Sequence, residues 1–189
     1  PDGSVRNVSA PYEIKPNDII GGFFQTGQTI DNAVSLSGGS EKGNVNAGFS
    51  NTNQGGIIPN QFVRRTSFYT GGNATLDNGI TVSGTVNYVN TTQQSPRSGA
   101  SAFNDYYGGG GGSIYARLFY LPRNFDLMGL PYVNPADGSN IFYRALDNPR
   151  WIAENNLFKS NVNRAYGNLS IGYDIADGIN VTLKGGINS

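Results

Sequence analysis

The sequence predicts an all-β protein whose antiparallel hairpins form part of a large transmembrane β-barrel. Three observations predict this fold class. Long segments alternate apolar and polar residues with a period of two, as two-faced strands do. The connections between these segments are alternately short and long, and aromatic residues recur at a similar distance from the short ones. Together these patterns favour a wall of strands with one apolar and one polar face.

The first expected elements are an irregular segment and a hairpin. Residues 1–27 contain three prolines and are predicted to be irregular and to lead into the barrel, with a short helical or strand-edge segment near 17–24. Alternation begins at Gln28 and continues on both sides of a polar turn at 38–43. Val34 and Phe49 lie on the apolar side of this pattern, which therefore predicts a two-faced hairpin.

Residues 62–92 carry the clearest strand pattern, on either side of the turn Asp77-Asn78-Gly79. If Gly79 adopts the left-handed conformation, Leu76 lies opposite Ile80. The face shared with that pair is then apolar or small along its whole length, and the other face carries Ser, Thr and Asn. The predicted register pairs Ala74 with Val82, Gly72 with Gly84, Thr70 with Val86 and Phe68 with Tyr88.

The last expected element is a second hairpin of the same kind, in which alternation returns at Arg164. Its loop, Ala176-Asp177-Gly178, again has three residues and ends in Gly. The predicted register places Ile175 opposite Ile179, Tyr173 opposite Val181 and Ile171 opposite Leu183. Before this hairpin, Ser113 to Leu121 is predicted to form a two-turn helix that Ser113 caps and Pro122 ends.

The lengths of the connections predict the setting of these strands. Connections 38–43, 77–79 and 176–178 are short, whereas 51–61 and 93–161 are long. Outer-membrane barrels have short periplasmic turns and long extracellular loops, so this alternation predicts a bacterial outer membrane. The expected division is an irregular segment at 1–27, about four barrel strands at 28–92, a long extracellular loop at 93–161 and a two-stranded hairpin at 162–189.

Five aromatic residues are predicted to form the outer membrane girdle. They lie about 7–11 residues from a short turn, and ten tilted strand residues rise about 25 Å, which is about the height of the apolar band of such barrels. The alternative is that aromatic residues simply favour strands. The five residues are Phe49, Phe68, Tyr69, Tyr88 and Tyr166.

The composition excludes several classes of function. Lys and Arg total 13 and equal Asp plus Glu, so no net positive charge favours nucleic acid. Cys and His are absent, which removes thiolate chemistry and the commonest general base. Residues 108–112 lack the Gly-Lys-Ser/Thr of a phosphate loop, and 134–140 lack the terminal Glu of an EF-hand. We therefore predict no enzymatic activity, cofactor or metal site.

The long loop is the predicted place for contact with a ligand or a protein partner. It concentrates aromatic and Arg side chains, which suit sugar rings and protein interfaces alike. The alternative is that these side chains pack the loop against itself and the rim of the barrel. The candidate residues are Tyr106, Tyr107, Arg117, Tyr120, Arg123, Tyr143, Arg144 and Trp151.

Several motifs, in this order, resemble those of one transporter family. They are the stretch Val34 to Lys42, the loop Gly55 to Asn60, the strand Ile80 to Tyr88, the tetrapeptide Asn148-Pro149-Arg150-Trp151 and the hairpin from Asn163 to Asp177. The sequence resembles the SusC/RagA family of TonB-dependent outer-membrane transporters of Bacteroidetes across most of residues 17–187. Each motif is short, and their ordered succession gives the resemblance its specificity.

The resemblance implies a barrel of about 22 strands with a plugged lumen. It also implies a plug domain that engages the TonB complex, a SusD-like surface lipoprotein as partner, and uptake of oligosaccharides or peptides as nutrients. About six strands and no plug are visible in this sequence, so we expect a fragment of such a barrel. The alternative hypothesis is a non-transporting, β-rich bacterial surface or adhesion module that folds as a soluble monomer.

Overall fold

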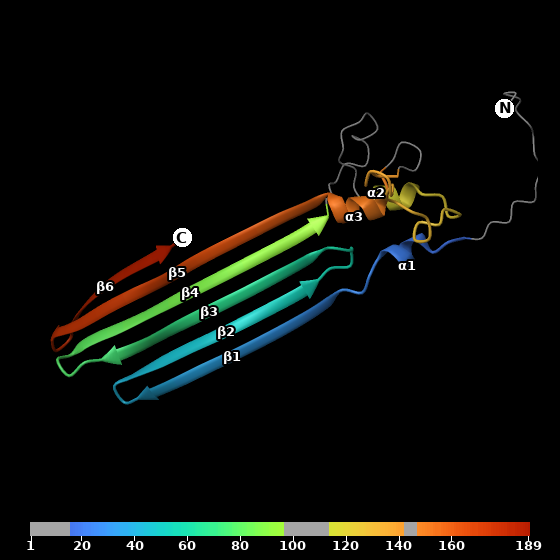
Figure 1. Cartoon of the computed structure of the whole chain (residues 1–189). Helices are drawn as coiled ribbons and strands as arrows, with labels where there is room; N and C mark the ends of the chain where they lie inside the picture. The colour runs from blue at the N-terminus through green and yellow to red at the C-terminus, as the bar shows by residue number, and fades with distance from the viewer. Residues whose placement is uncertain (1–15, 97–113, 142–146) are drawn as a thin grey trace, which may run out of the picture.

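The structure, a computed structural model, describes residues 16–96, 114–141 and 147–189. Six strands form one antiparallel sheet and lie side by side in chain order, as Figure 1 shows. They are β1 (Gln28–Ser40), β2 (Gly43–Gly55), β3 (Phe62–Thr75), β4 (Ile80–Pro96), β5 (Leu157–Ala176) and β6 (Ile179–Asn188). The predictions of an all-β fold and of antiparallel hairpins are confirmed.

The register of the β3–β4 hairpin is the predicted one. Gly79 has a φ of +82°, and the amide of Leu76 donates to the carbonyl of Ile80 at 2.8 Å. Only a residue that tolerates the left-handed region closes this turn without strain, which Gly does. All four predicted cross-strand pairs, from Ala74 with Val82 to Phe68 with Tyr88, are present.

The other two turns are tighter than predicted. Ser40 pairs with Gly43, so the first hairpin turns at Glu41 and Lys42 alone and the predicted loop at 38–43 is wrong. Neither Glu41 nor Lys42 has a positive φ, so this two-residue turn is not of the mirror-image types that favour Asn and Gly. The two charged side chains also supply the polar tip of the hairpin.

The β5–β6 hairpin contains a β-bulge that shifts one predicted pair. Tyr173 faces Val181 as predicted, but Ala176 rather than Ile175 pairs with Ile179. Ile175 is therefore the extra residue of the bulge, which adjoins a two-residue turn at Asp177-Gly178. The predicted opposition of Ile175 and Ile179 is wrong, whereas the register beyond the bulge is correct.

Three strands are longer than their alternation predicted. β2 continues to Gly55, β4 continues to Pro96, and β5 already begins at Leu157. In the extensions of β2 and β4 the period of two fades because both faces carry polar side chains, while the hydrogen-bonded ladder continues. The start of β5 instead has Leu157 and Phe158 side by side, which breaks the alternation. The long connection consequently spans 97–156 rather than 93–161.

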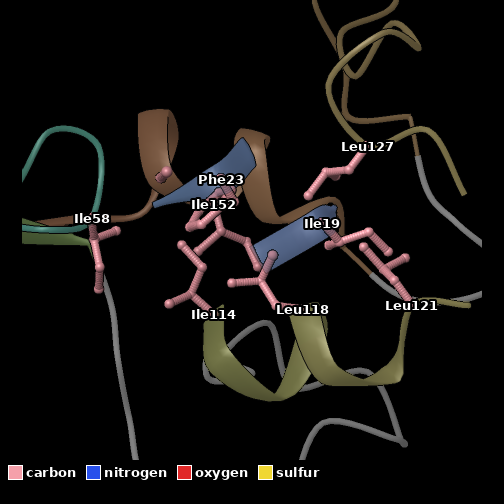
Figure 2. Packing of buried hydrophobic residues seen from close by; sticks show 9 residues of the cluster. Ile19, Phe23, Ile58, Ile114, Leu118, Leu121, Leu127 and Ile152 are labelled. Carbon is pink, nitrogen blue, oxygen red and sulfur yellow. The ribbon is translucent and has the colours of Figure 1, made fainter. Parts of the chain in front are cut away.

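The buried core lies at one end of the sheet, opposite the three short turns (Figure 1). We call this assembly the cap; it comprises α1 (Ile19–Phe23), α2 (Ile114–Tyr120), α3 (Pro149–Asn155) and the loop residues that pack on them. Figure 2 shows the side chains of the three helices converging. The core consists of Ile19, Phe23, Ile58, Ile114, Leu118, Leu121, Leu127, Ile152 and Ala153.

Each cap helix has a local origin in the sequence. The carboxylate of Asp18 accepts from the amide of Gly21 at 2.8 Å and caps α1, within the segment expected to be helical or at a strand edge. α2 matches the predicted helix, although its predicted cap, Ser113, lies outside the described residues. α3 was not predicted; Asn148 caps it and Pro149 is its first residue. No helix in the described ranges has the length and apolarity to cross a membrane.

Candidate functional site

One face of the sheet is apolar over the half that adjoins the short turns. The register places side chains from all six strands on this face, and those that define it are 41–73% exposed. A continuous exposed apolar surface of this kind marks a protein or membrane contact. We call it the apolar band: Val34, Leu36, Val45, Phe49, Phe68, Val86, Tyr88, Leu169, Ile171, Tyr173, Val181, Leu183 and Ile187.

A row of aromatic side chains ends the apolar band on the side of the cap. Phe49 pairs with Phe68, and Phe68 pairs with Tyr88, so the three rings occupy adjacent strands at one level. The hydroxyl of Tyr88 donates to the carboxamide oxygen of Asn163 at 2.9 Å. The ring of Tyr88 thus belongs to the band while its polar end reaches the next level, as amphipathic aromatics do at an interface.

Beyond the aromatic row the same face becomes polar. The amide of Asn51 donates to the hydroxyl of Thr66 at 3.0 Å, and the amide of Asn90 donates to the oxygens of Asn161 and Asn163 at 2.9 and 2.7 Å. These side chains occupy the level directly above the aromatic row and the one after it. The face therefore changes from apolar to hydrogen-bonding within one step along the strands.

Two of the five predicted girdle residues lie on the opposite face. Tyr69 pairs with Asn87, and Asn87 pairs with Tyr166, one residue out of phase with Phe68 and Tyr88. Distance from a turn fixes the level of a residue, whereas alternation fixes its face, and the prediction used distance alone. The five residues therefore do not lie on one face: Phe49, Phe68 and Tyr88 share the apolar face, and Tyr69 and Tyr166 lie on the other.

The candidate contact residues of the long loop that the structure describes differ in location and in exposure to solvent. Arg117 is 6% exposed and belongs to the interior of the cap, and Trp151 is half-buried on α3. Tyr120 and Arg123 are exposed at the end of α2 and just beyond it. The other four candidates, Tyr106, Tyr107, Tyr143 and Arg144, lie outside the described residues.

A pocket of about 500 Å³ lies between α1 and α2. Arg123 lines it together with Asp18 and Phe119, and the backbone amide of Asn17 donates to the carbonyl of Arg123 at 2.7 Å. Of the four candidate residues that the structure describes, Arg123 alone lines this pocket. The structure therefore does not gather the described candidates into one site.

Arg150 has a structural role in the cap that the sequence did not reveal. One terminal nitrogen of its guanidinium donates to the carbonyls of Leu127, Met128 and Leu130 at 3.3, 3.1 and 3.1 Å. The guanidinium also lies 3.9 Å from the ring centroid of Tyr132. One side chain thus fixes the segment that runs beside α3.

The hydroxyl of Tyr132 donates to the carboxylate of Glu154 at 2.5 Å. This hydrogen bond is the main reason that the pKa of Tyr132 is raised above its ordinary value. Tyr132 therefore stays protonated in neutral solution and keeps the contact to α3. In the sequence, only the dipeptide Asn148-Pro149, a common helix start, indicated that a helix begins near Arg150 and Glu154.

Replacing Arg150 with Lys is expected to loosen the segment 127–132. An ammonium has no planar fork for stacking and bonds fewer carbonyls, so we expect a loss of about 2 kcal/mol of local stability. Hydrogen exchange of the amides at 127–132 measures this loss. The matched control is Arg123→Lys, since Arg123 is exposed. Equal exchange in the two variants would contradict the role assigned to Arg150.

No metal site is present within residues 16–96, 114–141 and 147–189, where three acidic, His or Cys side chains never come together.

Comparison with known proteins gives no family: no protein-family model matches the chain, and no curated protein matches it.

Proposed function

We propose that the chain forms a section of the wall of a TonB-dependent outer-membrane transporter. It would import oligosaccharides or peptides together with a SusD-like surface lipoprotein, driven by the TonB complex. One observation carries this proposal: a sheet face that is apolar up to an aromatic row and hydrogen-bonding beyond it. The ordered motifs that resemble the SusC/RagA family support the choice of transporter class.

The dimensions of the apolar band support contact with lipid. Its levels on β4 run from Ile80, which pairs with Tyr173 of the band, to Tyr88, and at about 3.3 Å per residue this is about 26 Å along the strand. At a tilt of about 40° this corresponds to about 20 Å across the membrane, about four fifths of the roughly 25 Å apolar height of an outer-membrane barrel. Thr70, a hydroxyl within the band, donates to the carbonyl of Asn46 at 3.2 Å and so needs no water.

The two edges of the sheet support membership of a larger sheet. β1 and β6 each pair on one side within the described residues, which leaves a row of backbone groups without ladder partners. β5 has 20 residues and β6 has 10, so the outer edge of β5 is also open toward the cap. In hydrocarbon such groups must find partner strands, which further strands of a closed barrel provide.

A second candidate function is a non-transporting surface or adhesion module in water. The exposed cap, with its pocket beside Arg123, is the observation that favours it. In that case the apolar band would face water rather than lipid. The transporter wall predicts that the side chains of the apolar band face lipid, and the surface module predicts that they face water. Chemical labelling of these positions therefore distinguishes the two functions.

Single Cys substitutions test the proposal, because the chain contains no Cys. On intact cells, a membrane-impermeant maleimide is expected to label Phe119→Cys in the cap and to spare Asp177→Cys at the turns. Opening the outer membrane is expected to expose Asp177→Cys. Leu183→Cys, in the band, is expected to stay unlabelled until the protein is denatured.

The matched control is Lys184→Cys, the neighbour of Leu183 on the polar face, which is expected to react once the membrane is open. Leu183 is 73% exposed in the isolated chain, so only an external layer can protect it. Labelling of all four variants on intact cells would exclude the transporter wall and favour the surface module.

A further inference from the structure

The polar face carries two exposed tyrosines with an amide between them. Asn87 pairs with Tyr69 on one neighbouring strand and with Tyr166 on the other. Directly opposed residues project from the same face, so the three side chains form one row. The two rings are 42% and 39% exposed. With strands about 4.8 Å apart, the two tyrosines stand about 10 Å from each other, at the level of the aromatic row on the other face.

The neighbours of the two rings hold them without covering them. A Cβ on Gly48 would lie 2.2 Å from Cε1 of Tyr69, so this ring occupies the space that the glycine leaves open. The guanidinium of Arg164 lies 5.4 Å from the ring centroid of Tyr166 and donates to Asn188 at 3.1 Å. Both rings are thus supported by the sheet and still open to solvent.

Asn87 supplies unused hydrogen-bonding groups between the rings. Among the described residues its side-chain amide makes no hydrogen bond, unlike the amides of Asn51 and Asn90 on the other face. The carboxamide therefore has two donors and an acceptor available for a ligand. A ligand that bridges the tyrosines would satisfy them.

The surrounding face suits a neutral ligand. From this row to the short turns it carries Ser, Thr and Asn side chains and two charged ones, Asp174 and Lys184. Toward the cap the same face also carries Arg65. Asp174 already accepts from the amide of Asn180 at 2.7 Å. Arg164 is likewise engaged by Asn188 and by the ring of Tyr166. Hydroxyl and amide groups with open aromatic faces match a polyhydroxy ring, whose C–H groups meet the negative face of an aromatic ring.

We propose that Tyr69, Asn87 and Tyr166 form a carbohydrate platform on which the tyrosines contact two pyranose rings of one neutral oligosaccharide. This inference rests on the proposed function, in which the polar face lines the transport path. It selects oligosaccharides over peptides, because the row itself offers two rings and an amide and carries no charge. The tyrosines contact the sugar faces, and Asn87 bonds the hydroxyls between them.

Calorimetric titration of the natural full-length protein in detergent, with short neutral gluco-, manno- and xylo-oligosaccharides, tests the platform. One of these series is expected to bind, and Tyr69→Ala and Tyr166→Ala are each expected to raise its Kd about five- to tenfold. Tyr69→Phe and Tyr166→Phe retain the ring and are expected to bind nearly as the natural protein does. Asn87→Ala is expected to weaken binding by a similar factor.

Phe158→Ala is the matched control, because Phe158 is an exposed aromatic on the same face outside the platform. Far-ultraviolet circular dichroism of every variant verifies that the sheet is intact. Binding that is absent in the natural protein, or unchanged in both tyrosine-to-alanine variants, would overturn the platform. Neither result touches the labelling pattern that tests the transporter wall, so the two failures are distinguishable.

Discussion

Leu169→Arg is expected to destabilise the membrane-inserted protein by about 2–4 kcal/mol, the cost of an Arg facing lipid at the midplane of a barrel. Leu169 pairs with Gly84 and Gly185, halfway between the aromatic row and the turn end of the band. Its side chain is 52% exposed in the isolated chain, so no internal cavity or clash contributes. Chemical denaturation in lipid vesicles measures the change.

Asn168→Arg is the control, because the adjacent residue carries the same new charge on the polar face. We expect it to change the free energy of unfolding by less than about 0.5 kcal/mol, as surface substitutions do. A water-exposed sheet would accept both arginines equally. Similar stabilities for the two variants would therefore exclude lipid contact and favour the surface module.

Ile152→Ala is expected to destabilise the cap by about 3 kcal/mol. Ile152 is 1% exposed and lies among the side chains of α1 and α2 (Figure 2). Its truncation removes buried methyl groups and leaves a cavity that three short helices can only partly fill. Limited proteolysis of residues 114–141 follows the loss, and the ladder amides of β3 and β4 should keep their exchange protection.

Phe119→Ala serves as the control for this variant. Phe119 lies on α2 but is 76% exposed, so a larger side chain is removed with little loss of burial. Its effect on the free energy of unfolding is expected to stay below about 0.5 kcal/mol. Equal proteolysis of the two variants would mean that the buried cluster does not hold the cap together.

The register of the sheet was predictable where the turn and the alignment of apolar residues on one face indicated the same strand pairing. The glycine of Asp77-Asn78-Gly79 fixed one register, and that register alone aligned the small and apolar residues on a single face. Ends of strands were missed where both faces are polar, since backbone pairing leaves no periodic signal there. α3 was missed because seven residues that include Pro149 and Trp151 show no helical period.

The site was predictable only in part. The sheet face of a residue follows from alternation along the strand, whereas burial in the cap depends on tertiary packing. The level of Tyr69 and Tyr166 followed from their distance to a turn, but their face required the alternation as well. The burial of Arg117 depends on how three short helices meet, which no local pattern encodes. The hydrogen bonds from Arg150 to three carbonyls arise from the same tertiary packing.

The cap has its own core, and this allows it to evolve separately from the sheet. Its apolar contacts are among its own helices and loops and Ile58 of the β2–β3 connection. Hydrogen bonds from Gln25 to Ile57 and from Asn60 to Ala153 also tie it to that connection. Substitutions that reshape the pocket beside α2 therefore leave the strand ladder unchanged. Loops on a rigid scaffold tolerate substitution in this way, because the hydrogen-bonded ladder that supports them does not depend on their side chains.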